Sequence, residues 1–197
     1  MDCIELCAAV LQWHCTVNST PALSSLGPQK TSFHSCRVPP ISVSDYVARI
    51  YRYSKCSPEC CVIALVYMDR FLAATATPLT LYNVHRMVLI SIMIAAKLRD
   101  DIYFSNGYYG SIGGIPRDEI NRLETTFLTT CNWALWVEPL NYWEYLEQSA
   151  LKVRSHSIGP TAGPMTLQPL SSTPNGKHQS NNFGAQGEQP TLDDDGK

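Results

Sequence analysis

The residues with the most reactive side chains in this sequence are its eight cysteines. Thiolates bind zinc where paired ligands converge, and they form disulfides in exported proteins. The sequence has no C-x-x-C pair, and the one grouping with another ligand type is Cys56 and Cys60 with His85. A closed zinc site needs four converging ligands. We therefore expect no metal, and reduced thiols that pack as small apolar side chains.

Motifs for phosphate binding and nucleophilic catalysis are missing as well. The sequence has no glycine-rich phosphate loop, no G-x-S-x-G and no H-E-x-x-H. The spacing of Gly110, Gly113 and Gly114 does not match G-x-G-x-x-G. No histidine or cysteine has a recognisable base and orienting partner. We expect neither enzymatic activity nor a cofactor.

Overall charge and hydropathy exclude two further classes of partner. The chain has 197 residues and a net charge of −2, so it offers no electrostatic field for nucleic acid. The apolar run over residues 84–96 is interrupted by His85 and Arg86 and is too short to span a membrane. The first thirteen residues contain two acids and no Lys or Arg, unlike a secretory signal. We expect an intracellular protein, in the nucleus, the cytoplasm or both.

Four charged residues stand where the surrounding pattern does not predict them. Glu124 interrupts an apolar helical stripe, either at its edge or paired within the chain. Lys97 follows Ala95-Ala96 at the end of an apolar run, where it either complements the negative helix end or donates to the backbone of an approaching helix. Asp100 and Asp101 follow at the same end, which is unfavourable for acids unless they cap the next turn or meet an external cation.

Five helices account for the apolar periodicity of the middle of the chain, and they predict an all-α fold. The expected helices cover residues 42–54, 58–76 and 81–98, and two more follow Pro116 and Pro139. Ser57 is the expected N-cap of the second helix, and Asn141 with Glu144 forms a capping-box pattern in the fifth. The third helix is apolar on almost every side, which predicts a central position.

The flanking segments differ from this middle zone in composition. Residues 1–40 form an N-terminal extension, in which residues 4–17 are an amphipathic helix laid on the domain or a partner contact. Residues 41–150 form the domain, and the Pro-, Gly- and Ser-rich residues 151–197 are expected to be disordered. That tail contains Thr173-Pro174, the minimal form of a proline-directed phosphorylation site. The seventeen-residue connection over residues 99–115 is either functional or internally packed.

Residues 39–146 resemble the cyclin box, in particular its U-type and P-type branch. The resemblance is carried by Val66-Tyr-Met-Asp-Arg-Phe-Leu72, Asn83-Val-His-Arg86, Ala95-Ala-Lys-Leu-Arg-Asp-Asp101, Asn106–Gly114 and Leu123-Glu124. It implies one five-helix cyclin box with a cyclin-dependent protein kinase as its partner in a heterodimer. Nothing after residue 150 matches a second box.

The resemblance also assigns roles to individual residues. Lys97 and Glu124 match the family's Lys/Glu pair, which contacts the αC helix of the kinase. Asp69 and Arg70 match the Asp-Arg element of the family. The arginine that pairs with this aspartate in other cyclins is missing, because Pro40-Ile41-Ser42 occupies its place. Asp69 is therefore treated as a structural residue without an assigned partner.

The mechanism implied by the resemblance is activation of the kinase through the position of its αC helix. Asp101 would in addition meet a kinase arginine that otherwise binds an activation-loop phosphate. Two alternatives from other classes remain open: a cyclin-fold nucleic-acid factor, and an adaptor that binds a kinase or another partner without activating it. Cell-cycle control and nutrient signalling are both compatible with this branch.

Overall fold

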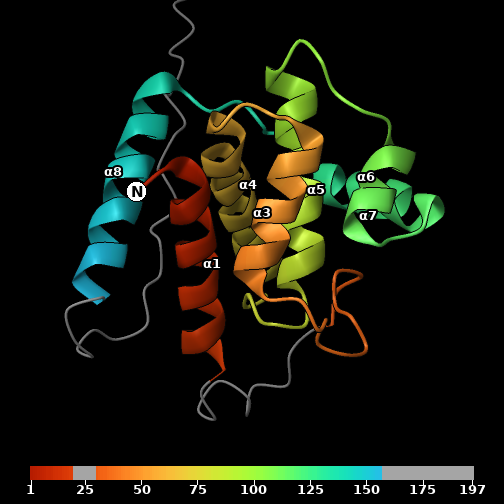
Figure 1. Cartoon of the computed structure of the whole chain (residues 1–197), viewed down its shortest axis with the longest axis horizontal. Coiled ribbons are helices and arrows are strands. Elements are labelled where there is room, and N and C mark those ends of the chain that lie inside the picture. Colours follow the sequence, from red (N-terminus) through yellow and green to blue (C-terminus); the bar gives the residue numbers. More distant parts are fainter. Residues whose placement is uncertain (20–29, 157–197) are drawn as a thin grey trace, which may run out of the picture.

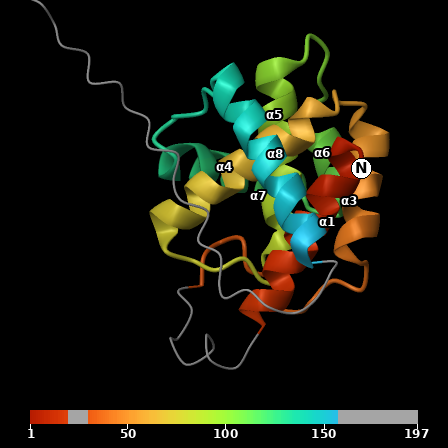
Figure 2. The ribbon, with the colours of Figure 1, turned by 90° about the vertical axis from the view of Figure 1, so that its left-hand side faces the viewer.

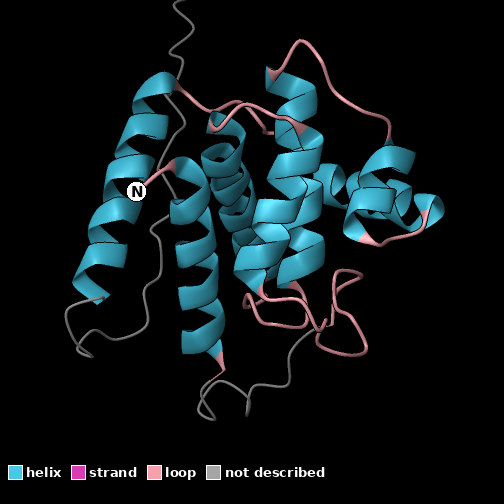
Figure 3. Cartoon of the chain, viewed as in Figure 1, coloured by secondary structure: helices cyan, strands magenta, loops and turns pink. Residues whose placement is uncertain are grey.

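The computed structural model describes residues 1–19 and 30–156. These residues form seven helices and no strand (Figures 1 and 3), so the predicted all-α class is confirmed. The helices are α1 (Cys3–Asn18), α3 (Val43–Ser54), α4 (Glu59–Thr75), α5 (Val84–Arg99), α6 (Asn106–Gly113), α7 (Arg117–Thr130) and α8 (Pro139–His156). The five expected helices correspond to α3, α4, α5, α7 and α8. None of the described helices is long and apolar enough to cross a membrane.

The apolar helix α5 occupies the centre of the bundle, as its composition predicted. Every residue from Val84 to Ala96 is buried except Arg86. The helix packs against α3, α4, α6 and α7. A helix enclosed on all sides cannot tilt or slide without disturbing its neighbours, so α5 fixes the positions of the residues at its two ends.

The N-terminal residues form a helix that lies on the bundle, which was one of the two possibilities left open by the sequence. Asp2 and Glu5 form a capping box that starts α1. Its apolar side chains, including Leu6, Cys7 and Leu11, are buried. α1 contacts α3, α4 and α8, and Figure 2 shows it beside α8.

The segment before α3 also contributes to the core. Phe33 is fully buried, and its ring lies 4.9 Å from that of Phe71 and 6.0 Å from that of Phe127. This Ser/Thr/Pro-rich stretch therefore anchors one aromatic side chain between α4 and α7. Periodicity did not predict this contact, because a single buried ring produces no pattern.

The long connection between α5 and α7 is internally packed and contains α6. Ser105 caps this helix, and Gly114, with a φ of 70°, ends it. Tyr109 and Ile112 are buried. Gly113 has no positive φ. It is a site of close approach instead, because a Cβ there would lie 2.2 Å from Leu89 Cδ2.

Two of the expected helix starts were wrong. Ser57 does not cap α4 with its side chain, because its hydroxyl donates to Asp100, 43 residues away. Asn141 lies inside α8, which begins at Pro139. At its other end α8 continues to His156, six residues beyond the end expected for the domain.

Candidate functional site

The structure brings Lys97 and Glu124 together at the junction of α5 and α7. Lys97 Nζ lies 2.6 Å from Glu124 Oε1, and their side chains are 24% and 18% exposed. Lys97 Nζ also donates to Asn106 Oδ1, while Asn106 Nδ2 donates to Glu124 Oε2 at 2.7 Å. The three side chains form a closed set of interactions, which we call the Lys97–Asn106–Glu124 triad.

Three helices position this triad. The last turn of the enclosed helix α5 carries Lys97, and the first residue of α6 is Asn106. On α7, Glu124 lies between the buried residues Leu123 and Phe127, so its carboxylate is held at the edge of the core. Asn106 was part of the resemblance but was not predicted as a site residue. Its role depends on α6, which the sequence pattern did not reveal.

Exposed apolar side chains lie close to Lys97 and Asn106 in the sequence, at the end of α5, on the connection to α6 and on α6 itself. Leu98, Ile102 and Tyr103 are more than half exposed, although large apolar side chains usually lie inside. Tyr108 is held nearby, because its hydroxyl donates to the carbonyl of Tyr53. These four side chains with the triad form the surface that we call the α5–α7 surface. Protein interfaces combine apolar and hydrogen-bonding side chains, and this surface offers both kinds.

A hollow lined by side chains of polar residues continues this surface along α7. It has a volume of about 470 Å³ and is lined by Asn121, Arg122, Thr125, Thr126 and Thr129. Asn121 connects it to the triad, since Asn106 Nδ2 donates to Asn121 Oδ1 at 2.7 Å. The hydroxyls of the three threonines donate to carbonyls of the preceding turn of α7, so they can only accept hydrogen bonds from a partner.

The two aspartates after α5 have different surroundings. Asp100 accepts hydrogen bonds from the backbone and the hydroxyl of Ser57, and Cys60 Sγ lies 3.6 Å from its carboxylate. The carboxylate of Asp100 therefore caps the start of α4, where the helix dipole favours it. Asp101 is exposed, and among the described residues its side chain has no hydrogen bond or ion pair.

Asp69 and Arg70 form hydrogen bonds on the side of the bundle where α8 packs. The Tyr145 hydroxyl donates to Asp69 Oδ2 at 2.6 Å. Burial raises the pKa of Asp69 to about 7, while the Tyr145 hydrogen bond and the charge of Lys152 act in the opposite direction. The Arg70 guanidinium donates to the carbonyls of Ala134 and Trp136. Asp69 therefore connects α4 to α8, and Arg70 connects α4 to the segment between α7 and α8.

The Asn-Val-His-Arg run places three polar side chains at the start of α5. Asn83 accepts from the Thr80 backbone and donates to the Pro78 carbonyl. His85 Nε2 donates to the carbonyl of Ile41, and burial lowers the pKa of His85. Arg86 forms an ion pair with Glu119 of α7 at 2.7 Å. Each side chain thus holds a segment next to α5.

The one grouping of possible metal ligands noted in the sequence is Cys56 and Cys60 with His85. No three His, Cys, Asp or Glu side chains among the described residues are placed to hold a metal ion. The His85 ring donates to the carbonyl of Ile41 instead of turning to a cysteine. All eight cysteines of the chain are free thiols. Thr173 and the rest of the predicted tail from residue 157 lie outside the described residues.

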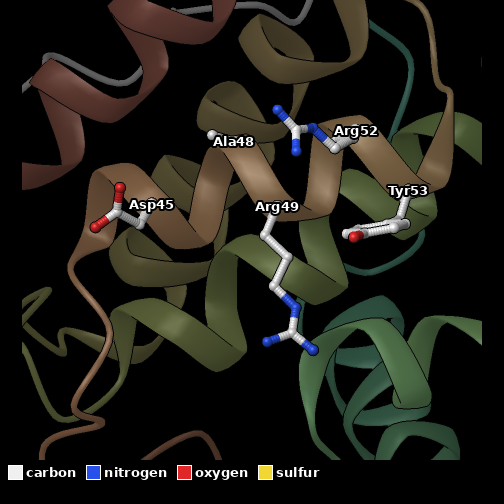
Figure 4. A pocket seen from close by; sticks show the side chains of 5 residues that line it. All are labelled: Asp45, Ala48, Arg49, Arg52 and Tyr53. Atoms are coloured by element: carbon white, nitrogen blue, oxygen red, sulfur yellow. The ribbon is translucent and has the colours of Figure 1, made fainter.

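A second hollow, of about 430 Å³, lies on the outer face of α3 (Figure 4). It is lined by Asp45, Ala48, Arg49, Arg52 and Tyr53. Figure 4 shows Arg49 and Arg52 pointing to opposite sides of the helix, so their guanidinium groups do not converge on one ligand. We therefore assign no site to this face.

Comparison with known proteins agrees with this architecture. Residues 8–135 match the model of the cyclin family, a range that begins within α1 and ends shortly after α7. The chain is 42% identical over 130 residues to Cyclin-U4-1 of Arabidopsis thaliana, an alignment that covers 64% of each protein. It is 44% identical over 116 residues to Cyclin-U3-1 of Arabidopsis thaliana, which covers 58% of this chain and 52% of that protein.

A rice relative shows a comparable similarity. Cyclin-P3-1 of Oryza sativa subsp. japonica is 41% identical over 118 residues, which cover 60% of this chain and 50% of that protein. The matched region thus spans between half and about two thirds of the length of these relatives. The chain belongs to the cyclin family. Within that family, whose members are regulatory proteins and not enzymes, it is similar to the U-type and P-type cyclins, as the resemblance indicated.

Proposed function

We propose that this chain binds a cyclin-dependent serine/threonine protein kinase and activates it by docking and repositioning the kinase αC helix. The single observation that carries the proposal is the half-buried Lys97–Asn106–Glu124 triad beside the exposed apolar side chains of the α5–α7 surface. Cyclin family membership supplies the class of partner.

The physical basis of activation is a shift of population. Phosphoryl transfer by protein kinases requires an ion pair between a strand lysine and a glutamate of αC. A surface that binds αC only in its inward position favours the active conformation. About 5.5 kcal/mol of differential affinity moves a conformational equilibrium from 1:99 to 99:1. The enclosed position of α5 suits this task, because a rigid surface does not follow the helix back to its inactive position.

Within this proposal the triad supplies orientation and the apolar side chains supply buried area. Lys97 and Glu124 already satisfy each other, so exchange of one hydrogen bond for a contact with the kinase backbone leaves no charge unpaired. Leu98, Ile102 and Tyr103 lose exposed apolar surface on binding, which stabilises the complex by about 25 cal/mol per Å² before the costs of association.

Kinase assays with each candidate cyclin-dependent kinase, alone and with this protein, test the proposal. The double variant Lys97→Ala/Glu124→Ala is expected to lose activation and to bind at least about tenfold more weakly, by loss of contacts worth 1.4 kcal/mol or more. The matched control is Arg86→Ala/Glu119→Ala, an ion pair of similar exposure between the same two helices but at the far end of α5.

Equal losses in the two double variants would contradict the proposed location, because general destabilisation would then explain both. Stable binding by the wild-type protein without activation would favour an adaptor. Absence of binding to every candidate kinase would refute the proposal as a whole.

Asp101 extends the proposal to the activation loop of the kinase. Its exposed carboxylate has no partner among residues 1–19 and 30–156 and can pair with a kinase arginine that otherwise binds an activation-loop phosphate. Asp101→Ala is expected to lower the activity of complexes with dephosphorylated kinase severalfold and to have little effect on phosphorylated kinase. Equal activity of the variant and wild-type complexes with dephosphorylated kinase would refute this role.

A further inference from the structure

A serine followed by a proline stands in the turn between α3 and α4. Ser57 and Pro58 come directly before α4, which begins at Glu59, and α3 ends at Ser54. A serine or threonine before a proline is the minimal form of a proline-directed phosphorylation site. The family resemblance and the proposed docking of a kinase give Ser57 no role.

The turn that carries Ser57 lies at the surface. Lys55, Pro58 and Glu59 are exposed, and Ser57 is half-buried. Residues 55–57 belong to neither helix, and the residue before a proline favours extended conformations. A surface segment outside the helices opens at a lower free energy than a packed helix does. The hydroxyl of Ser57 is therefore within reach of a modifying enzyme.

A second pair of this kind among the described residues is buried. Thr77-Pro78 follows α4, Thr77 is 4% exposed, and its hydroxyl donates to the carbonyl of Thr75. The same two-residue pattern thus occurs once at the surface and once inside the described part of the chain. Thr77 serves as an internal negative control for Ser57.

In the unmodified protein the Ser57 hydroxyl binds Asp100. The hydroxyl oxygen lies 2.5 Å from Asp100 Oδ1, and the Ser57 backbone nitrogen donates to Asp100 Oδ2 at 3.0 Å. Neither of the two ion pairs between described residues includes Asp100. A phosphate on Ser57 brings about two negative charges against this unpaired carboxylate.

We propose that Ser57 is phosphorylated by a proline-directed serine/threonine protein kinase, and that the phosphate separates the end of α5 from the start of α4. In the transfer Ser57 Oγ attacks the γ-phosphorus of ATP, the bond from this phosphorus to the β,γ-bridging oxygen breaks, and ADP leaves. The hydroxyl proton passes to the catalytic aspartate of the kinase. A phosphatase reverses the modification with water, which restores the serine and releases inorganic phosphate.

The phosphate displaces the Asp100 carboxylate from the start of α4. Ser57 has lost the proton that it donated to Asp100, and the two anions repel each other. The phosphate is covalently attached beside the positive end of α4, where the helix dipole favours it, so Asp100 moves away. Because Asp100 directly follows α5 and lies three residues after Lys97, the connection from α5 to α6 loses its contact with α4.

The connection that is released carries part of the α5–α7 surface. Ile102 and Tyr103 lie between Asp100 and α6, and both are more than half exposed. Phosphorylation of Ser57 therefore weakens the docking of the cyclin-dependent kinase. This last consequence rests on the proposed function, whereas the modification and the release of Asp100 do not.

The modification is tested on the full chain with Mg·ATP and an active mitogen-activated protein kinase, a proline-directed enzyme that needs no cyclin. Tandem mass spectrometry locates the phosphate, which we expect on Ser57 and not on Thr77. Asp100→Ala frees the hydroxyl and should accelerate phosphorylation of Ser57 at least about fivefold. The matched control Asp101→Ala should react at the rate of the wild-type protein.

Two results would overturn the modification. One is an unmodified Ser57 in the wild-type protein, both with this enzyme and with an active cyclin-dependent kinase already bound to another cyclin. The other is phosphate on Thr77 at a rate similar to that of Ser57, because an unfolded chain would then be the substrate.

Hydrogen exchange measures the release of Asp100. Backbone amides of residues 97–106 should exchange at least about tenfold faster after phosphorylation, whereas those of residues 84–92 in the enclosed part of α5 should not change. Equal exchange of residues 97–106 in the two forms would overturn the release.

Binding assays with the cyclin-dependent kinase test the regulation separately. Weaker binding by the protein phosphorylated at Ser57 than by the unmodified protein supports it, and equal binding contradicts it. Failure of the unmodified protein to bind any candidate kinase would refute the proposed function and the regulation with it, but the phosphorylation and exchange results decide the rest of the proposal.

Discussion

Asp100, directly after α5, accepts two hydrogen bonds from Ser57, which lies just before α4. The Ser57 backbone nitrogen lies 3.0 Å and the Ser57 hydroxyl oxygen 2.5 Å from the Asp100 carboxylate. The contact joins two helices whose interacting residues are 43 positions apart. It resolves an apparent conflict in the sequence, where an acid stands at the negative end of α5. The same carboxylate lies at the positive end of α4, and the second interaction is favourable.

Removal of this carboxylate is expected to destabilise the protein. Asp100→Ala leaves the Ser57 backbone and hydroxyl without their acceptor, and the free energy of unfolding should fall by about 1–3 kcal/mol. The matched control is Asp101→Ala, the same substitution one residue further on, which should stay within about 0.5 kcal/mol. Chemical denaturation measures both values. Equal effects would contradict the role assigned to Asp100.

The buried carboxyl of Asp69 predicts a dependence of stability on pH. Its pKa is raised to about 7 in the folded protein from 3.8, so between these values the folded state binds more protons than the unfolded state. The stability that this group contributes is present below about pH 4 and is lost as the pH rises towards 7. Asp69→Asn keeps an oxygen that accepts from Tyr145 but does not titrate.

Relative to the wild-type protein, Asp69→Asn should therefore gain stability between pH 4.5 and 7.5, on the order of 2 kcal/mol. Thermal unfolding of both proteins over this range measures the difference, in which the contributions of other groups largely cancel. A difference that is constant with pH would contradict the raised pKa.

Two asparagines should differ in how much they contribute to stability, because one forms buried hydrogen bonds and the other only matched a capping pattern in the sequence. Asn83 is buried and holds the turn before α5 with two hydrogen bonds, so Asn83→Ala should cost about 2 kcal/mol of unfolding free energy. Asn141 lies within α8, so Asn141→Ala should change this value by less than about 0.5 kcal/mol. Urea denaturation of the two variants checks the contrast, and a large loss for Asn141→Ala would restore its predicted role as a cap.

Two glycines of α6 should respond in opposite directions to the same substitution. A Cβ at Gly113 would lie 2.2 Å from Leu89 Cδ2 and 2.9 Å from the Tyr46 hydroxyl, so Gly113→Ala should destabilise the protein by about 1–3 kcal/mol. A Cβ at Gly107 has no heavy atom nearer than 3.7 Å, and Gly107→Ala should be neutral or stabilising by up to about 1 kcal/mol. Melting temperatures suffice for the comparison, and a stabilised Gly113→Ala would show that α6 does not pack closely on α5.

The elements that the sequence predicted well are those with long apolar stripes. The burial of nearly every residue of α5 follows from its composition, since a helix without a polar face is stable only inside a bundle. By contrast, α6 has eight residues, including three glycines, and only Tyr109, Gly110 and Ile112 are buried. So short a stripe does not stand out from a loop.

The sequence likewise predicted some residues of the candidate site and not others. The apolar pattern indicated that Glu124 and Lys97 are charged residues in apolar surroundings, and the resemblance to cyclins identified them as a pair. Neither source gave the third member, Asn106, because its contribution requires α6 to begin at the point where α5 and α7 meet. The partners of Asp69 and Arg70 were likewise unknown, because Tyr145 and the Trp136 carbonyl are 76 and 66 residues away.

By itself, the sequence determined the helical class, the central position of α5 and the absence of a recognisable catalytic motif, since apolar spacing and residue type are local properties. Tertiary structure alone decided that Asp100 caps α4 and that Asn106 completes the triad. The physical reason is the range of the interactions. Periodicity reports which face of a helix is buried, whereas hydrogen bonds between distant segments depend on how the helices pack in three dimensions.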